Sequence, residues 1–303
     1  MDDILTTEEI SNARSESFVG EMNVLKMAWW KELSNLTGAY DSVSVLRSFI
    51  DAMFYTLNGE HDKVKDIPCL AGKDYDKRIR ILQRAMRFLG ESMEANRFVD
   101  FLGAADQALR GKGSQDCTGA FYTPTNVCEA MADCNKDAAI QAKFERGEIV
   151  TVYDPTVGAG RTLLAWCKVN AKYLEQIRAF GTDIEINAVR MFYVNCALNG
   201  IAARCTHGNE LSNDREWAVY YTPEWRVYEY NRNIKIQMDK WRSIFQGMHD
   251  VTVESTAQEP QETPEVPELD NSTTQEQNAP ETPAEPEKMD VTIDSDGQMT
   301  FNF

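Results

Sequence analysis

The chain has 303 residues, and its hydrophobic content of 43% is enough for a folded core plus an accessory part. Its 7 cysteines form no C-x-x-C pair and cannot all pair with one another, and only 3 histidines accompany them, so neither a disulfide framework nor a metal site is expected. No apolar run approaches about 18 residues, and the acidic N-terminus has no apolar signal-peptide core. We therefore expect a cytoplasmic protein without a membrane partner.

The net charge of −17 is unevenly distributed along the chain. Residues 251–303 hold 13 of the 48 acidic residues but only 1 of the 31 basic ones. The preceding part is therefore only mildly acidic and is not a general polycation that would attract nucleic acid. Binding to DNA would need a local basic patch or a partner.

Residues 1–110 have helical patterns and are predicted to form a helical N-terminal domain. The clearest pattern lies in residues 75–89, where apolar residues recur every 3 or 4 positions and share one face; they are Ile79, Leu82, Met86 and Leu89. The opposite face is basic and is either a solvated face or a strip that contacts phosphates; it carries Lys77, Arg80, Arg84 and Arg87.

Residues 111–249 alternate between short apolar runs and helical stretches, which is typical of β-α-β units with a parallel sheet. The pattern predicts an α/β, Rossmann-like domain with a short parallel sheet. Strands are expected at residues 149–153, 179–183, 202–207 and 216–221, crossover helices at 161–177 and 186–199, and a last helix at about 234–245.

Residues 250–303 form an acidic tail rich in Pro, Glu, Thr, Gln and Ser. Such a segment cannot bury enough apolar area to offset the entropy of ordering it, so the tail is predicted to be disordered. Only its last residues, 296–303, regain apolar character.

The segment DPTVGAG, residues 154–160, follows the first predicted strand. Gly158 and Gly160 let the backbone approach a ligand where a Cβ atom would collide, and the helix that follows directs free N–H groups at the loop. Two glycines alone indicate either a nucleotide site or only a tight turn. Asp154 suits a ligand with a positive ammonium better than a pyrophosphate, and it therefore favours S-adenosylmethionine over a dinucleotide.

Three further segments could contribute to such a site. Asp183 ends the next strand, where a carboxylate can bind both ribose hydroxyls, or it could cap the following helix. Asn209 follows the third strand and could bond the adenine edge, or it could form only a turn. The aromatic pair before Thr123 could flank the ligand, or this segment is a loop in which Thr123 caps a helix that begins at Pro124.

Four blocks of the sequence resemble, in the same order, the modification subunit of type I restriction systems, which belongs to the adenine-N6 DNA methyltransferase family. They are GAFYTPTNVCEAM (119–131), YDPTVGAGRTLLAW (153–166), GTDIEINAVRMFYVNCALNGI (181–201) and HGNEL (207–211). The resemblance covers about residues 95–225 and is closest to short members from phages and other mobile elements. It implies S-adenosylmethionine as the cofactor and DNA as the partner, reached directly or through a specificity subunit.

The resemblance also implies which residues bind the cofactor. These are Phe121 and Thr123 at its methionine end, Asp154 at its amine, Gly158 and Gly160 in the loop, Asp183 at the ribose, and Ile184 and Asn209 at the adenine.

One motif of the family is absent. The family carries Asn/Asp-Pro-Pro-Tyr/Phe at the end of its fourth strand, where the first residue and a proline carbonyl accept hydrogen bonds from the target amine and the aromatic ring stacks on a flipped base. No such tetrad occurs in this chain, and the predicted fourth strand is followed instead by Thr222-Pro223-Glu224-Trp225. The implied catalytic positions are therefore Thr222, Pro223 and Trp225, of which the tryptophan can still stack while the threonine is a weaker acceptor.

Two functions follow from these observations. The first is an adenine-N6 DNA methyltransferase linked to restriction-modification or mobile-element DNA. The alternative is a catalytically inactive relative that acts as a DNA-associated scaffold, regulator or anti-restriction factor. In addition, the terminal hexapeptide Gln298–Phe303 resembles the short peptide by which bacterial proteins dock on the sliding DNA clamp, so the clamp is a candidate partner and a frayed tail is the alternative.

Overall fold

The computed structural model describes residues 5–16, 18, 21–118, 122–212, 216–255, 290–293 and 299–302. The chain divides into two compact units, Met1–Phe245 and Gln246–Phe303. The boundary predicted at residue 110 lies inside a helix of the first unit, so the predicted helical and methyltransferase-like domains share one compact unit.

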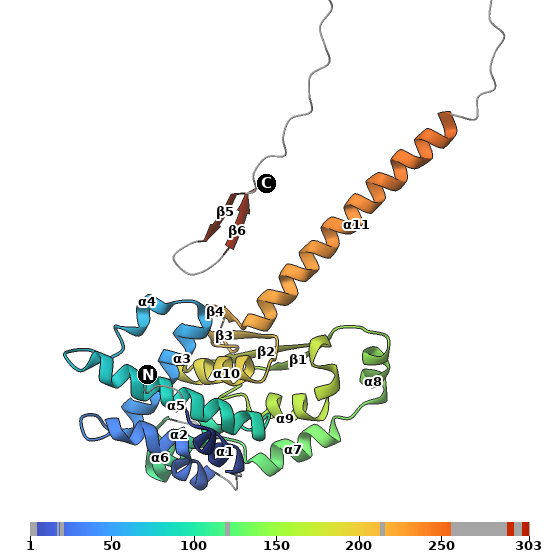
Figure 1. Ribbon diagram of the computed structural model, residues 1–303. Helices are drawn as coiled ribbons and strands as arrows, with labels where there is room; N and C mark the ends of the chain where they lie inside the picture. Colours follow the sequence, from blue (N-terminus) through green and yellow to red (C-terminus); the bar gives the residue numbers. More distant parts are fainter. Residues whose placement is uncertain are drawn as a thin grey trace, which may run out of the picture. The chain divides into compact units, whose positions relative to one another are not determined.

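Helices form the first part of this unit (Figure 1). The apolar stripe predicted for residues 75–89 lies in α5, where Leu82 and Leu89 are fully buried. The helices and 3-10 turns of this part are α1 (Thr7–Ser15), η1 (Glu21–Lys26), α2 (Ala28–Leu33), η2 (Ser34–Leu36), α3 (Ser42–Asn58), α4 (His61–Val64), α5 (Tyr75–Ala95), α6 (Phe101–Thr118), α7 (Thr125–Cys134) and α8 (Ala138–Glu145).

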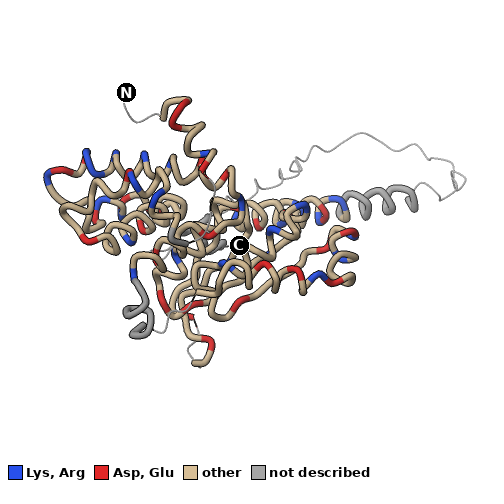
Figure 2. The backbone as a smooth tube through the Cα atoms, turned by 90° about the horizontal axis from the view of Figure 1, so that it is seen from below, with Lys and Arg blue, Asp and Glu red and all other residues tan. Residues whose placement is uncertain are grey.

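The basic face of α5 is partly used for contacts between helices. Arg84 forms ion pairs with Glu9 of α1 at 2.7 Å and with Glu32 of α2 at 3.6 Å. Figure 2 shows basic and acidic residues interspersed along the described chain. Arg84 therefore holds α1 and α2 together with α5, which favours the structural interpretation of this face over a phosphate-contacting strip.

Four strands form one sheet in the order β1-β2-β3-β4 (Figure 1). The first three are parallel, and their register sets Asp154 opposite Gly181 and Asp183 opposite His207, so their carboxyl ends lie along one edge. The elements of this segment are β1 (Val150–Asp154), α9 (Arg161–Val169), η3 (Ala171–Gln176), β2 (Ile177–Asp183), α10 (Ile186–Leu198), β3 (Ala203–Gly208) and β4 (Glu216–Tyr221).

The fourth strand differs from the prediction. β4 pairs with β3 in the antiparallel direction, so the prediction of a sheet that is parallel throughout is wrong. The reason is the connection, because only residues 209–215 join the two strands, whereas a parallel strand needs a crossover of about a dozen residues or more. Tyr221, the last residue of β4, lies opposite Arg204 near the start of β3.

One face of the sheet is covered by α9 and α10 (Figure 1). Two right-handed crossovers that advance in the same direction place both helices on the same face. The N-terminal helices extend this core, since α3 packs against α10 and Phe54 meets the rings of Tyr193 and Tyr220 edge-on at 5.0 and 4.9 Å. An ion pair of 2.6 Å between Asp51 and Arg190 joins the same two helices.

The other face of the sheet meets the start of the last long helix. α11 (Pro223–Ser255) is longer than the helix predicted for residues 234–245, because proline is favoured in a first helical turn and begins the helix directly after β4. The ring of Trp225 lies edge-on to Phe180 of β2 at 5.3 Å. Among the residues that the structure describes, every helix is too short or too polar to cross a lipid bilayer.

The second unit contains a short hairpin, formed by β5 (Asp290–Ile293) and β6 (Met299–Asn302). The prediction of disorder is therefore wrong for these two strands and for residues 250–255, which belong to α11. Residues 256–289 of the predicted tail lie outside the described residues, as do Gln298 and Phe303 of the clamp-like peptide.

Candidate functional site

The carboxylate that ends β1 fixes the loop after the strand. Asp154 accepts hydrogen bonds from the Thr156 amide at 3.0 Å and from the Thr162 hydroxyl of α9 at 2.5 Å. Gly158 and Gly160 have φ angles of +54° and +88°, a left-handed backbone that costs other residues about 1–2 kcal/mol. The predicted glycine loop is thus a compact turn between β1 and α9.

Asp183 ties this loop to the next strand. Its carboxylate accepts a hydrogen bond from the Gly158 amide at 2.9 Å and another from the Glu185 amide at 2.8 Å. The N-cap of α10 is Glu185, so the alternative that Asp183 caps this helix is wrong. Burial raises the pKa of the Asp183 carboxyl above its ordinary value, against the effect of the two amide hydrogen bonds, and the nearby carboxylates of Glu185 and Asp154 raise it further.

The two loop glycines have different tasks. A Cβ atom on Gly160 would lie 2.4 Å from Cδ2 of Phe192, so this glycine is needed for packing of α10 against the loop. A Cβ atom on Gly158 would have its nearest neighbour, Cε1 of Tyr122, at 4.0 Å. Among the residues that the structure describes, Gly158 therefore has space around it that Gly160 lacks.

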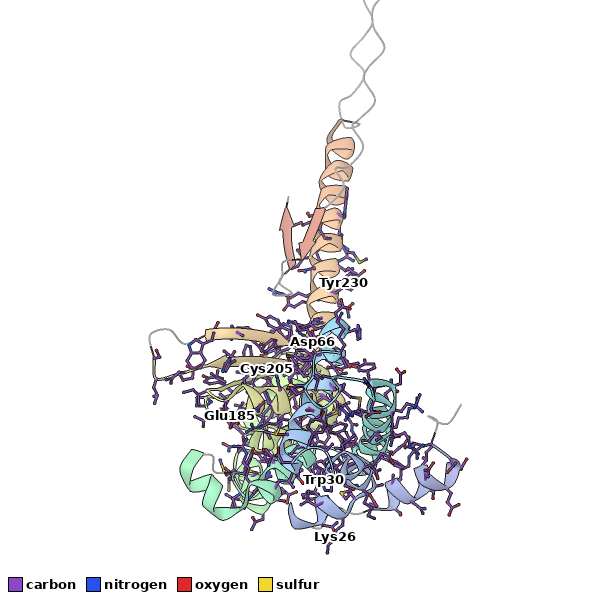
Figure 3. The ribbon with its side chains drawn as sticks, turned by 90° about the vertical axis from the view of Figure 1, so that its left-hand side faces the viewer. Lys26, Trp30, Asp66, Glu185, Cys205 and Tyr230 are labelled. Atoms are coloured by element: carbon purple, nitrogen blue, oxygen red, sulfur yellow. The ribbon has the colours of Figure 1, made fainter. Side chains whose placement is uncertain are left out.

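Two residues of α6, Asp106 and Arg110, form a polar network with the loop residue Tyr122 and with the turn after β2, and the sequence did not predict this network. Asp106 accepts hydrogen bonds from the Tyr122 hydroxyl at 2.7 Å and from Arg110 at 2.9 Å, and Arg110 also pairs with Glu185 at 2.9 Å. Glu185, labelled in Figure 3, directly follows Asp183 and Ile184. The network therefore fixes Tyr122 beside Gly158 and holds the turn that carries Asp183.

A second buried cluster holds the start of α9 and was also missed. Arg161 pairs with Asp100 at 3.2 Å, and Asp100 accepts further hydrogen bonds from the Gly103 amide at 2.7 Å and from Asn195 at 2.9 Å. Burial raises the pKa of the Asp100 carboxyl, while Arg161 and these hydrogen bonds act in the opposite direction. The position of Asp100 three residues before Gly103 is a helix-cap pattern that could have indicated its role.

The remaining predicted cofactor residues lie around the same edge, with one exception. The Thr123 carbonyl accepts a hydrogen bond from Arg161 at 3.0 Å, whereas Phe121 lies outside the described residues. Ile184 follows Asp183 and is 61% exposed, so its apolar side chain is accessible beside the Asp183 carboxylate. The Asn209 side chain accepts the Leu211 amide at 3.0 Å and so forms the turn after β3.

The predicted catalytic residues do not join this group. Thr222 is fully buried, donates to the Ile201 carbonyl and accepts from the Ala203 amide, both at 2.9 Å, at the amino end of β3. The register separates Thr222 from Asp183 by two strands and four residues, roughly 16 Å at about 4.8 Å per strand and 3.3 Å per residue. The prediction that Pro223 and Trp225 follow a fourth parallel strand is therefore wrong, because β4 runs antiparallel to β3.

The chemistry of the loop suits a positively charged ligand. Three carboxylates, those of Asp154, Asp183 and Glu185, lie along the loop and the turn after β2. The arginines beside them, Arg110 and Arg161, both form ion pairs with carboxylates. A pyrophosphate at this edge would therefore be repelled by the carboxylates. In the part of the chain that the structure describes, no group of three or more His, Cys, Asp or Glu residues could hold a metal ion.

Comparison with known proteins identifies the same segment. A family model described as N-6 DNA methylase matches residues 108–257, about half of the chain. This span includes the end of α6, the glycine loop, the whole four-stranded sheet and α11. No solved structure gives a significant match.

Proposed function

Because the chain belongs, through residues 108–257, to the N-6 DNA methylase family, we propose that it binds S-adenosylmethionine at the carboxyl ends of β1 and β2 and takes part in N6-methylation of adenine in DNA. The hydrogen bond of 2.9 Å from Gly158 to Asp183 supports this function most directly. It joins the glycine loop to Asp183, the carboxylate at the end of the next strand, and a nucleoside cofactor needs these two groups next to each other.

The cofactor supplies an activated methyl group on a positive sulfonium, and the residues of the chain bind and orient it. Asp154 binds the amine and Asp183 the ribose hydroxyls, since each carboxylate oxygen has more than one lone pair to share. Ile184 packs against the adenine ring, and Asn209 bonds its edge. Phe121 and Thr123 hold the methionine end.

The residues that would bind the target adenine are not found at this edge of the sheet. The tetrad of the family is absent from the sequence, and Thr222 is bound to Ile201 and Ala203 at the other edge of the sheet. We therefore assign the binding of the target adenine to a partner subunit, as in a restriction-modification or mobile-element system in which a second protein recognises the DNA.

The position of Thr222 also favours a second candidate function. A chain that keeps the cofactor loop but uses its tetrad-like segment for packing could bind S-adenosylmethionine without transferring the methyl group. It would then serve as a DNA-associated scaffold, regulator or anti-restriction factor.

Transfer of a labelled methyl group separates these two functions. The full chain is incubated with S-adenosylmethionine labelled in its methyl group and with unmethylated DNA in an extract of its native host, which supplies the partner subunit, and DNA from that host is sequenced for N6-methyladenine. Label in adenine that is lost in Asp183→Ala but kept in Asp133→Ala supports the enzyme. Cofactor binding without methyladenine in either assay supports the second candidate, and no cofactor binding contradicts both.

Docking on a sliding clamp through Gln298–Phe303 stays a separate prediction. Deletion of residues 298–303 should abolish capture of the chain on immobilised clamp. Equal recovery of the full and the shortened chain would contradict it.

A further inference from the structure

The start of β4 contains one residue more than the part of β3 that it pairs with. The register between the two strands shifts between His207 and Gly208 of β3. Their partners in β4 are Ala218 and Glu216, so Trp217 is the extra residue of a β-bulge. Bulges re-aim a side chain and are frequent next to active sites. Because β4 runs antiparallel to β3, this bulge lies at the edge where β2 and β3 end, which is also the edge of the glycine loop (Figure 1).

The ring of Trp217 is held beside the turn after β2. It lies edge-on to the ring of His207, with 4.9 Å between the ring centroids and 84° between the ring planes. His207 is the register partner of Asp183, and its Nε2 donates a hydrogen bond of 3.2 Å to the Ile184 carbonyl, which can only accept. Trp217 is 49% exposed, so part of its ring is accessible. One strand and one ring contact therefore separate an accessible tryptophan from the Asp183 carboxylate.

The direction in which the cofactor lies brings its base towards this tryptophan. This step rests on the proposed function, in which Asp154 binds the amine and Asp183 the ribose. Asp154 ends β1 and Asp183 ends β2, so the methionine part extends from the ribose towards β1. The base is attached to the ribose on the side opposite to the methionine part. It therefore extends towards β3, where His207 and Trp217 lie.

We propose that Trp217 stacks on the adenine ring of S-adenosylmethionine and is a binding residue of the cofactor site. A base has a flat aromatic face, and a tryptophan offers the largest ring surface of any side chain for stacking on it. The contact with His207 limits the orientations of the Trp217 ring before the cofactor binds, which lowers the entropy cost of stacking. Trp217 thus adds a ring contact to the apolar contact of Ile184 and the polar contact of Asn209.

The charges around Trp217 favour the base of the cofactor over a base of DNA. Glu216, directly before Trp217, forms a bidentate pair with Arg204 at 2.9 and 2.8 Å, so this arginine is already bound to a carboxylate. Asp183 and Glu185 place further carboxylates at the turn after β2. A DNA strand would bring its phosphates next to these acidic groups. S-adenosylmethionine has no phosphate and carries a net positive charge, so the same groups attract it.

Calorimetric titration of S-adenosylmethionine into the full chain tests the stacking. Trp217→Ala should weaken binding at least about fivefold, as expected when a ring that stacks on a base is removed, and Trp217→Phe should keep most of the affinity. Tyr230→Ala is the matched control and should bind like the wild type, since Tyr230 is 67% exposed but lies on α11. Equal affinity of the wild type and Trp217→Ala would overturn the stacking alone. Absence of binding to the wild type would contradict the proposed function and the stacking with it.

Tryptophan fluorescence separates stacking from a purely structural role of the bulge. Saturating S-adenosylmethionine should quench the emission of the wild-type chain, because an adenine that stacks on an indole quenches it. The quenching should be largely lost in Trp217→Phe, although this variant still binds the cofactor, and equal quenching in both chains would overturn the proposal. Binding of a single-stranded, adenine-containing oligonucleotide is measured for the same variants. A loss of oligonucleotide binding in Trp217→Ala at unchanged cofactor affinity would assign Trp217 to a base of DNA and would also overturn it.

Discussion

The Gly158 amide donates a hydrogen bond of 2.9 Å to the carboxylate of Asp183, 25 residues further along the chain. This hydrogen bond links the glycine-rich loop after β1 to the carboxylate at the end of β2. The same carboxylate also accepts the Glu185 amide at 2.8 Å, so the ionised form of Asp183 is the form that the surrounding backbone stabilises.

The affinity for S-adenosylmethionine should fall as the pH falls through the pKa of Asp183. Burial raises this pKa above the ordinary value of 3.8, so the carboxylate is protonated at a higher pH than an exposed aspartate. Binding is therefore complete above the raised pKa and is lost below it. Titrations of the cofactor between neutral and mildly acidic pH measure this, and Asp183→Asn should have a flat profile. An unchanged pH dependence in that variant would exclude Asp183 as its source.

The two loop glycines should respond differently to alanine. Gly160→Ala should lower the free energy of unfolding by more than about 2 kcal/mol, because the added Cβ atom would lie 2.4 Å from Phe192 and the backbone is left-handed. Gly158→Ala should cost about 1–2 kcal/mol, from its backbone alone, but should weaken cofactor binding.

Denaturant unfolding and cofactor titration check both variants. Gly90→Ala in α5 is the control, since no described atom outside the helix's own backbone lies within 4 Å of the added Cβ atom, and this variant should be more stable by about 0.5–1 kcal/mol. Equal stability of Gly158→Ala and Gly160→Ala would contradict the separate roles.

Thr222 should act in folding and not in chemistry. Thr222→Val keeps the shape of the side chain but leaves the Ala203 amide and the Ile201 carbonyl without their partner, at about 1–3 kcal/mol for each buried group. Thr222→Ser keeps the hydroxyl and should stay close to the wild type. Unfolding by denaturant gives the stabilities, and cofactor titration should give the same affinity for all three chains. Loss of methyl transfer in Thr222→Val under conditions where that variant is still folded, with activity kept in Thr222→Ser, would instead indicate a catalytic role of the hydroxyl.

The buried pair of Asp100 and Arg161 should be far more important for stability than a surface pair that also involves α9. Both side chains are almost completely buried, so Asp100→Ala leaves the buried Arg161 cation without its carboxylate and should cost about 3–5 kcal/mol. Glu129→Ala breaks the exposed pair with Lys168 between α7 and α9 and should cost less than about 1 kcal/mol. Thermal or denaturant unfolding compares the two, and similar losses would contradict the role of Asp100 as a buried anchor.

The parallel core of the sheet could be predicted because each of its strands is a short apolar run followed by a polar turn. The glycine loop and Asp183 were also predictable, since their residue types and spacing have a direct physical meaning. The direction of β4 was missed because its apolar run was interpreted without the length of the loop before it. Residues 209–215 are too few for a crossover, and this signal was present in the sequence.

Other features depend on contacts between distant segments and leave little trace in a local pattern. The bond between Asp106 and Tyr122 and the pairing of Arg110 with Glu185 join α6 to the loop and to the turn after β2. Asp100 meets Asn195, which is 95 residues away. Each of these residues is ordinary for its own helix or turn, and only packing gives it a partner.

The central claim is that the loop after β1 and Asp183 together bind S-adenosylmethionine. Calorimetric titration of the cofactor into the full chain, into Asp183→Ala and into Asp133→Ala tests it most directly. The account predicts binding by the wild type and by Asp133→Ala, with affinity reduced at least about tenfold in Asp183→Ala, since a hydrogen bond to a charged group contributes about 1.5–3 kcal/mol. Absence of binding to the wild-type chain, or equal affinity in Asp183→Ala, would contradict it.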